Sequence, residues 1–114
     1  MIISFGWTRD AFIAGRKSVT RRNWTDNYAR GVTPGCLMDA YDCSPRAGGR
    51  KIAVIRVLSC QREALSRLIT EPAYAREELQ KEGGMWRDVK EFLELFHNFH
   101  SSPYRIEFEI VYEK

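Results

Sequence analysis

KIAVIRVLS, the run from Lys51 to Ser59, is the most β-branched stretch of the chain. Its apolar side chains fall on both alternating positions, with Arg56 as the exception, which predicts a strand covered on both faces for much of its length. Near the C-terminus, residues 105–113 alternate apolar and charged side chains with a period of two, except for Val111 at one of the charged positions. This second pattern predicts a strand with one buried face and one exposed face.

Shorter elements are predicted on either side of these two strands. Residues 2–5 and 36–41 read as strands, and the second follows a Pro34–Gly35 turn. Thr8 is a candidate N-cap for a short helix over residues 9–14 that stops at Gly15.

Two helices are predicted in the block of about forty residues before the last strand. Thr70 can cap a helix that runs to Lys81 and is broken by Gly83 and Gly84. A second helix is predicted from Trp86 to about His97, because its apolar residues recur at helical spacing. The order of elements indicates an α+β fold, in which a small mixed or antiparallel β-barrel is flanked by helices.

Length and composition limit the class of protein. With 114 residues, 44% hydrophobic and 29% charged, the chain is expected to form one soluble globular domain over residues 1–114. A large multidomain enzyme and wholesale disorder are excluded. The sequence shows neither a long apolar run nor a signal-peptide pattern, so we expect a cytoplasmic protein without a membrane partner.

Cysteine and histidine positions give little support for a metal or cofactor. Cys36, Cys43 and Cys60 lack CxxC spacing and neighbouring histidines, so they are predicted to be reduced packing residues. His97 and His100 are three residues apart, but a metal would still lack two ligands, and we interpret them as helix-end or surface residues. We therefore expect neither a metal nor a cofactor.

Positive charge is concentrated in the first half of the chain. Residues 1–62 hold 11 Lys and Arg against 4 Asp and Glu, whereas residues 63–114 hold 7 against 11. A basic half favours a phosphate-bearing partner such as RNA, although a solvated mixed surface explains the counts equally well. The densest cluster is GRKSVTRRNW, residues 15–24, which indicates either an anion-binding segment or an edge strand protected by its cations.

Within this cluster, Gly15, Lys17, Thr20 and Arg22 form a G-x-K-x-x-T-x-R pattern that resembles the signature of the ASCH domain family in the PUA-like superfamily. The resemblance extends to the Pro34–Gly35 turn, although Cys36 stands where the family has Asp. It extends further to the following segments of the chain: Glu82-Gly83-Gly84, the aromatic residues Trp86, Phe92 and Phe96, and the strand from Tyr104 to Tyr112.

The resemblance implies a PUA-like β-barrel flanked by helices, with a cleft that binds RNA or a modified nucleoside. One small bacterial member of similar length is an N4-acetylcytidine amidohydrolase. Its Lys and Thr match Lys17 and Thr20, and its following Arg matches Arg22. Its Glu aligns with Glu82, although the alignment also permits Glu78 or Glu77.

These residue types suit amide hydrolysis. Lys17 could act as the base, Thr20 as the nucleophile and Glu82 as the proton shuttle. The candidates for binding the substrate are Arg21, Arg22 and Trp24. Arg22 could hold the negative charge that develops on the acyl oxygen.

Since Lys17 and Thr20 differ in parity, the segment must bend or bulge between them to bring both into one site. The purely structural interpretation is a salt bridge between Lys17 and Glu82, with Thr20 as an ordinary strand residue.

Two other functions remain open from the sequence. A non-catalytic RNA-binding module would use the basic face formed by Arg16, Lys17, Arg21, Arg22, Arg30, Arg46 and Arg50. A ribonuclease is compatible with the same Lys and Thr types, although no histidine pair lies on the basic segment. The sequence predicts neither the recognised base nor the oligomeric state.

Overall fold

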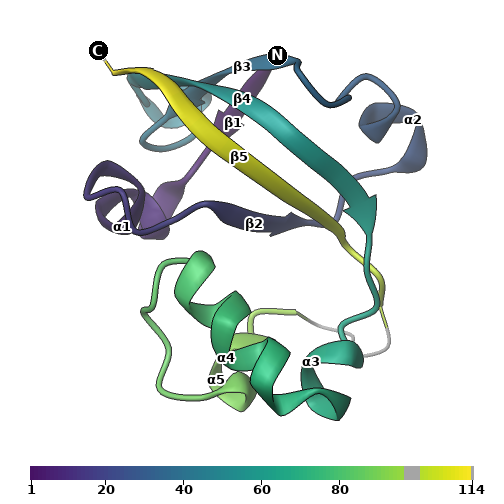
Figure 1. Cartoon of the computed structure of the whole chain (residues 1–114). Coiled ribbons are helices and arrows are strands. Elements are labelled where there is room, and N and C mark those ends of the chain that lie inside the picture. The colour runs from purple at the N-terminus through teal and green to yellow at the C-terminus, as the bar shows by residue number, and fades with distance from the viewer. Residues whose placement is uncertain (97–100, 114) are drawn as a thin grey trace.

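The computed structural model describes residues 1–96 and 101–113, without the side chains of Tyr112 and Glu113. A five-stranded sheet with the order β1-β3-β4-β5-β2 curves into a half-barrel, and helices α3, α4 and α5 lie together beyond strand β2 (Figure 1). Strands β1 and β3 are parallel, and the other neighbours are antiparallel. This arrangement confirms the predicted α+β class with a small barrel-like sheet flanked by helices.

The strands are β1 (Ile2–Ser4), β2 (Val19–Arg22), β3 (Leu37–Tyr41), β4 (Lys51–Arg62) and β5 (Tyr104–Glu113). The α-helices are α1 (Arg9–Ile13), α2 (Asp26–Ala29), α3 (Arg67–Thr70), α4 (Pro72–Lys81) and α5 (Val89–Leu93), and the 3-10 turns are η1 (Gly6–Thr8) and η2 (Pro45–Ala47). Each strand predicted from the sequence is present, and β4 extends three residues beyond Ser59.

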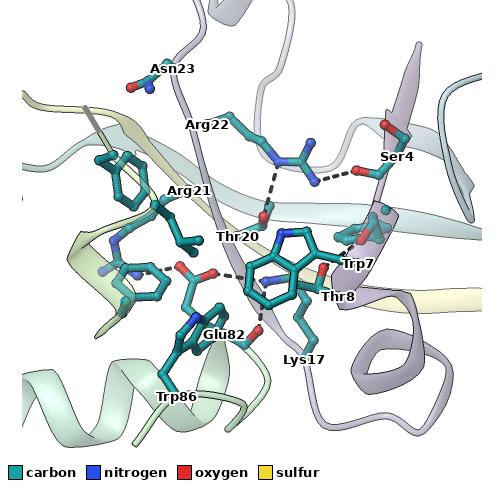
Figure 2. Close-up of a pocket in the computed structure, with 15 residues that line it drawn as sticks. Ser4, Trp7, Thr8, Lys17, Thr20, Arg21, Arg22, Asn23, Glu82 and Trp86 are labelled. Atoms are coloured by element: carbon teal, nitrogen blue, oxygen red, sulfur yellow. Dashed lines mark hydrogen bonds and ion pairs between the residues drawn. The ribbon is translucent and has the colours of Figure 1, made fainter. Parts of the chain in front are cut away.

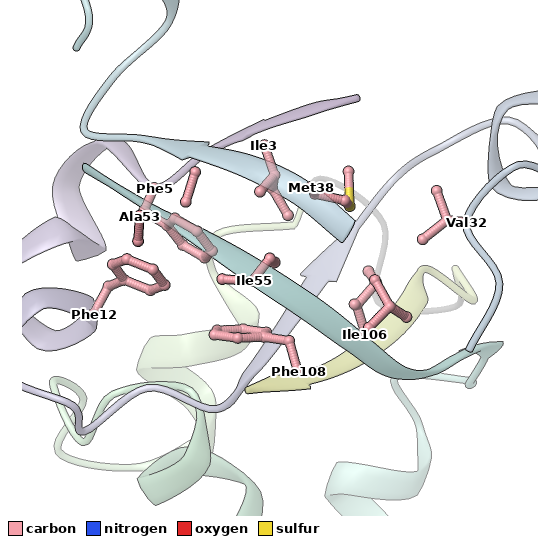
Figure 3. Close-up of a cluster of buried hydrophobic side chains, with 11 residues drawn as sticks. Ile3, Phe5, Phe12, Val32, Met38, Ala53, Ile55, Ile106 and Phe108 are labelled. Atoms are coloured by element: carbon pink, nitrogen blue, oxygen red, sulfur yellow. The ribbon is translucent and has the colours of Figure 1, made fainter. Parts of the chain in front are cut away.

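The main hydrophobic core fills the concave side of the sheet. Phe5 and Phe12 stack with their ring centroids 4.2 Å apart, and Phe108 packs against both rings (Figure 3). On β4 the buried residues are Ala53, Ile55 and Val57. The expected burial of both faces of this strand is wrong: Ile52 and Val54 are only partly buried and Leu58 is exposed, because no layer of the described residues covers the outer face fully.

Helices α3, α4 and α5 enclose a second apolar cluster of their own. Leu65, Leu68, Ala75, Leu79, Phe92 and Leu93 are its buried members. Helix α5 begins later than the sequence predicted, because the Asp88 side chain accepts a hydrogen bond from the Glu91 amide and fixes the N-cap there. Trp86 therefore lies before the helix. The predicted extension to about His97 is also wrong, because the helix ends at Leu93 and residues 94–96 form turns; His97 itself lies outside the described residues.

No helix in the described part of the chain has the length and apolar character to cross a membrane. Within residues 1–96 and 101–113, no group of three His, Cys, Asp or Glu side chains is arranged to hold a metal ion. Both histidines, His97 and His100, lie outside the described residues.

Candidate functional site

A cavity of about 370 Å³ opens where the two apolar clusters meet. Its walls come from β1 and η1 on one side, from β2 in the middle, and from the α4–α5 connection, α5 and the residues just after α5 on the other side (Figure 2). The polar and aromatic residues that line it include Lys17, Thr20, Arg21, Arg22, Glu82, Trp7, Trp86, Phe92 and Phe96. This volume lies within the roughly 300–1,000 Å³ typical of small-molecule sites.

Lys17 and Glu82 form a buried ion pair at the wall of the cavity. The Lys17 Nζ donates to Glu82 Oε1 at 2.9 Å and to the Glu82 backbone carbonyl at 2.8 Å. Their side chains are only 2% and 4% exposed. Burial lowers the pKa of the Lys17 ammonium, and attraction to Glu82 opposes that shift without reversing it.

Lys17 and Thr20 both line the cavity although their positions differ in parity. Lys17 lies before β2 in an irregular segment, and Thr20 lies within the strand. Ser18 anchors this segment, because its amide donates to the Lys81 carbonyl at 2.7 Å and its carbonyl accepts from the Phe108 amide at 3.0 Å. The same bond to Lys81 ties this segment to the C-terminal end of α4, which carries Glu82.

Arg21 lines the cavity, but carboxylates take up its terminal nitrogens. Its Nη1 donates to Glu82 at 2.7 Å, and its Nη2 donates to Glu63 at 2.7 Å and to Glu78 at 2.6 Å. Burial alone would lower the pKa of Arg21, but the ion pairs outweigh it and raise that pKa. Arg21 is therefore placed to orient Glu82, and of its guanidinium nitrogens only Nε lacks a partner among the described residues.

Arg22 and Thr20 form the polar centre of the cavity on β2. Arg22 Nε donates to Thr20 Oγ1 at 3.2 Å, and Arg22 Nη2 donates to the Ser4 carbonyl at 2.7 Å. The guanidinium also lies 5.4 Å from the Phe5 ring centroid. No carboxylate pairs with Arg22 among the described residues, and burial lowers its pKa. Its positive charge is thus available to an oxygen atom that enters the cavity.

Aromatic rings make the rest of the wall. Trp7 and Trp86 meet edge to face, with centroids 5.7 Å apart and an interplanar angle of 84°. Trp86 meets Phe92 in the same way at 4.8 Å. Trp24, the tryptophan predicted to hold a base, does not line this cavity; its ring packs against Tyr28 and the main core.

The structure thus brings five of the six predicted site residues to one cavity: Lys17, Thr20, Arg21, Arg22 and Glu82. Of the alternative acids, Glu78 is buried against Arg21 and Arg105, whereas Glu77 is exposed on α4. The sequence pattern places Trp86 at the start of the predicted apolar helix and does not distinguish Trp7 from Trp24. The role of Trp7 and Trp86 in the wall depends on how η1 faces the α4–α5 connection, which no local pattern encodes.

Comparisons with known proteins support the fold. No family model matches the chain, and no curated protein matches it. The crystal structure of the hypothetical protein PH0355 superposes with a TM-score of 0.65 at 11% identity, covering 96% of this chain and 97% of that chain. Protein EF3133 from Enterococcus faecalis V583, described as DUF984, superposes with a TM-score of 0.65 at 16% identity, covering 96% and 72%. At these identities the likeness concerns the fold alone.

Proposed function

We propose that this protein binds a modified nucleoside in the cavity and hydrolyses the amide of N4-acylated cytidine. The observation that carries the proposal is the convergence of Lys17, Thr20 and Glu82 on one cavity, with a direct contact of 2.9 Å between the Lys17 and Glu82 side chains. The resemblance of the G-x-K-x-x-T-x-R pattern to the ASCH domain family supports the same activity, and we propose membership of that family.

The reaction uses the residues as follows. Thr20 Oγ attacks the acyl carbon, and its proton passes to the neutral amine of Lys17. Arg22 stabilises the negative charge that develops on the acyl oxygen. The proton moves from Lys17 to Glu82 and then to N4 of the base, so that the C–N bond breaks and cytidine leaves. Lys17 then deprotonates a water that attacks the acyl ester on Thr20, and it returns this proton to Thr20 Oγ as the ester C–O bond breaks and the carboxylic acid leaves.

The surroundings of Lys17 and Thr20 favour these roles. Burial lowers the pKa of Lys17, which increases the fraction of neutral amine at a given pH. The hydrogen bond from Arg22 Nε to Thr20 Oγ1 leaves the hydroxyl proton free to transfer and stabilises the resulting alkoxide.

The cavity is better suited to a neutral base than to a phosphate backbone. Lys17 and Arg21, two cations of the proposed RNA-binding face, are buried and paired with carboxylates. Phosphate binding depends on cations that can exchange their counterions on the surface. Those two residues therefore favour a site for a single nucleoside over a binding surface for extended RNA.

A chromatographic assay of N4-acetylcytidine and other N4-acylated cytidines tests the proposal. We expect the wild type to release cytidine, Thr20→Val and Lys17→Ala to lose at least 10²-fold in rate, and Thr20→Ser to retain part of it. Thr33→Val and Lys90→Ala are matched controls, because both residues are exposed and away from the cavity. Circular dichroism checks that each variant is folded.

Absence of cytidine release by the folded wild type for every acylated cytidine would reject the amidohydrolase. Salt-sensitive binding of single-stranded RNA without turnover would then favour the binding module. Cleavage of a labelled RNA strand that is lost in Lys17→Ala would favour the ribonuclease.

A further inference from the structure

Trp7 is a large aromatic residue exposed at the wall of a cavity. Its side chain lies in η1, just after β1, and the residue is 60% exposed although it lines the cavity. Its edge-to-face contact with Trp86 leaves the two indole planes nearly perpendicular, at 84°. The rings form a corner beside the Lys17–Glu82 pair, and Figure 2 shows both indoles among the residues that surround it.

Within the described part of the chain, two buried nitrogen atoms of the cavity residues have no hydrogen-bond acceptor. Among the described residues, the buried side-chain polar atoms without a partner are Trp86 Nε1, Arg21 Nε and Ser101 Oγ. The first two belong to residues that line the cavity, and both are donors only. Leaving a buried donor unpaired is costly, so a ligand that brings an acceptor into the cavity gains from pairing with it.

These observations define a ligand with two properties. A flat aromatic ring can stack on an indole face and cover it from water, as unpaired nucleobases do on aromatic side chains. A carbonyl oxygen on the ring or its substituent can accept from an indole N–H. Cytosine and its N4-acyl derivatives combine a flat ring with carbonyl oxygens.

We propose that Trp7 and Trp86 are the residues that select the base: Trp7 stacks on the ring, and Trp86 Nε1 donates to a carbonyl oxygen of the bound nucleoside. This inference rests on the proposed function for its ligand class, but it concerns binding and is independent of turnover. Trp24, a candidate for substrate binding from the sequence, has no part in it, because its ring packs against Tyr28 and the core.

Calorimetric titration with cytidine, which has no acyl group to hydrolyse, tests the inference directly. We expect Trp7→Ala to raise the Kd about tenfold and Trp7→Phe to raise it much less, because Phe retains a ring for stacking. Trp86→Phe removes the N–H while keeping the ring, and it should raise the Kd roughly fivefold. Trp24→Phe is the matched control and should bind cytidine as the wild type does.

The outcomes separate this inference from the amidohydrolase. If cytidine binds with the expected dependence on Trp7 and Trp86 but no acylated cytidine is hydrolysed, the inference stands and the catalytic proposal fails. If N4-acetylcytidine is hydrolysed while Trp7→Ala and Trp86→Phe keep the wild-type KM and the wild-type Kd for cytidine, the inference fails alone. If the wild type binds neither cytidine nor N4-acetylcytidine, this inference is overturned.

Discussion

Lys17 illustrates how one buried residue can carry both a structural and a chemical role. Its two hydrogen bonds to Glu82 connect the segment before β2 to the C-terminal end of α4. The same burial opposes its charge and lowers its pKa. The salt bridge with Glu82 uses the ammonium form of Lys17, whereas the proposed base is the neutral amine. The two roles therefore belong to different protonation states, and the lowered pKa increases the share of the neutral one.

The pH dependence of hydrolysis follows from this lowered pKa. We expect kcat/KM for N4-acetylcytidine to rise with pH and to level off above an apparent pKa below 10.5, the ordinary value for lysine. The sign follows because deprotonation produces the active amine. Lys17→Arg, which keeps the charge but cannot lose it, should be inactive at every pH. A flat profile between pH 5 and 10, as an approximate working range, would contradict the role of Lys17 as base.

At the scale of elements, the end of helix α4 controls where Glu82 lies. Gly83 follows Glu82 with a φ of +133°, a backbone conformation that residues other than glycine rarely adopt. A Cβ atom at this position would lie 2.9 Å from the Ala11 Cβ on α1. The glycine therefore permits both the turn after α4 and the close approach of α1.

Replacement of Gly83 should disturb both stability and the site. We expect Gly83→Ala to lower the free energy of unfolding by about 2–3 kcal/mol, from backbone strain together with the contact to Ala11. Gly48→Ala is a control for strain alone, because Gly48 has a φ of +83° but open space around its Cβ position, and it should cost about 1 kcal/mol. Denaturant unfolding measures both variants. Equal losses would show that packing against α1 contributes nothing.

Local sequence patterns predicted the elements better than the surroundings of the site. The alternation of residues 105–113 predicted a strand, which is β5 in the structure. The cation-rich segment supplied Lys17 and Thr20 as site candidates, and both line the cavity. Helix α3 was not predicted, and Thr70, expected to start α4, is the last residue of α3. Trp24 and Trp7 look alike in sequence, and only the packing of η1 against the α4–α5 connection distinguishes their positions.

At the scale of the whole molecule, a buried charge network joins the helices to the sheet. Glu78 on α4 accepts from Arg21 on β2 at 2.6 Å and from Arg105 on β5 at 2.5 Å and 3.0 Å. Arg21 continues the network to Glu82, the acid of the proposed site. Fold and site are therefore coupled, because the contacts that dock α4 on the sheet also hold the cavity wall.

Removing the charge of Glu78 should destabilise the protein as a whole. We expect Glu78→Gln to lower the free energy of unfolding by about 3 kcal/mol, because Arg21 and Arg105 lose the carboxylate that both of them bind. Glu77→Gln, one residue earlier on the exposed side of α4, should change it by less than about 0.5 kcal/mol.

Acid unfolding then gives a sharper test of the role of the Glu78 carboxylate. Burial opposes ionisation of Glu78, but hydrogen bonds from Arg105 and Arg21 outweigh it and lower its pKa from 4.5 to about 2.

The native state therefore binds fewer protons than the unfolded chain between those two pKa values, and the stabilisation by Glu78 is complete above about pH 4.5 and is lost as the pH falls toward 2. The loss from this group is on the order of 3 kcal/mol. Urea unfolding across this pH range should show the wild type and Glu77→Gln losing stability together, with a steeper slope than Glu78→Gln. Parallel slopes for all three proteins would mean that the Glu78 carboxylate is not held ionised by the network, and the coupling between fold and site would have to run through other contacts.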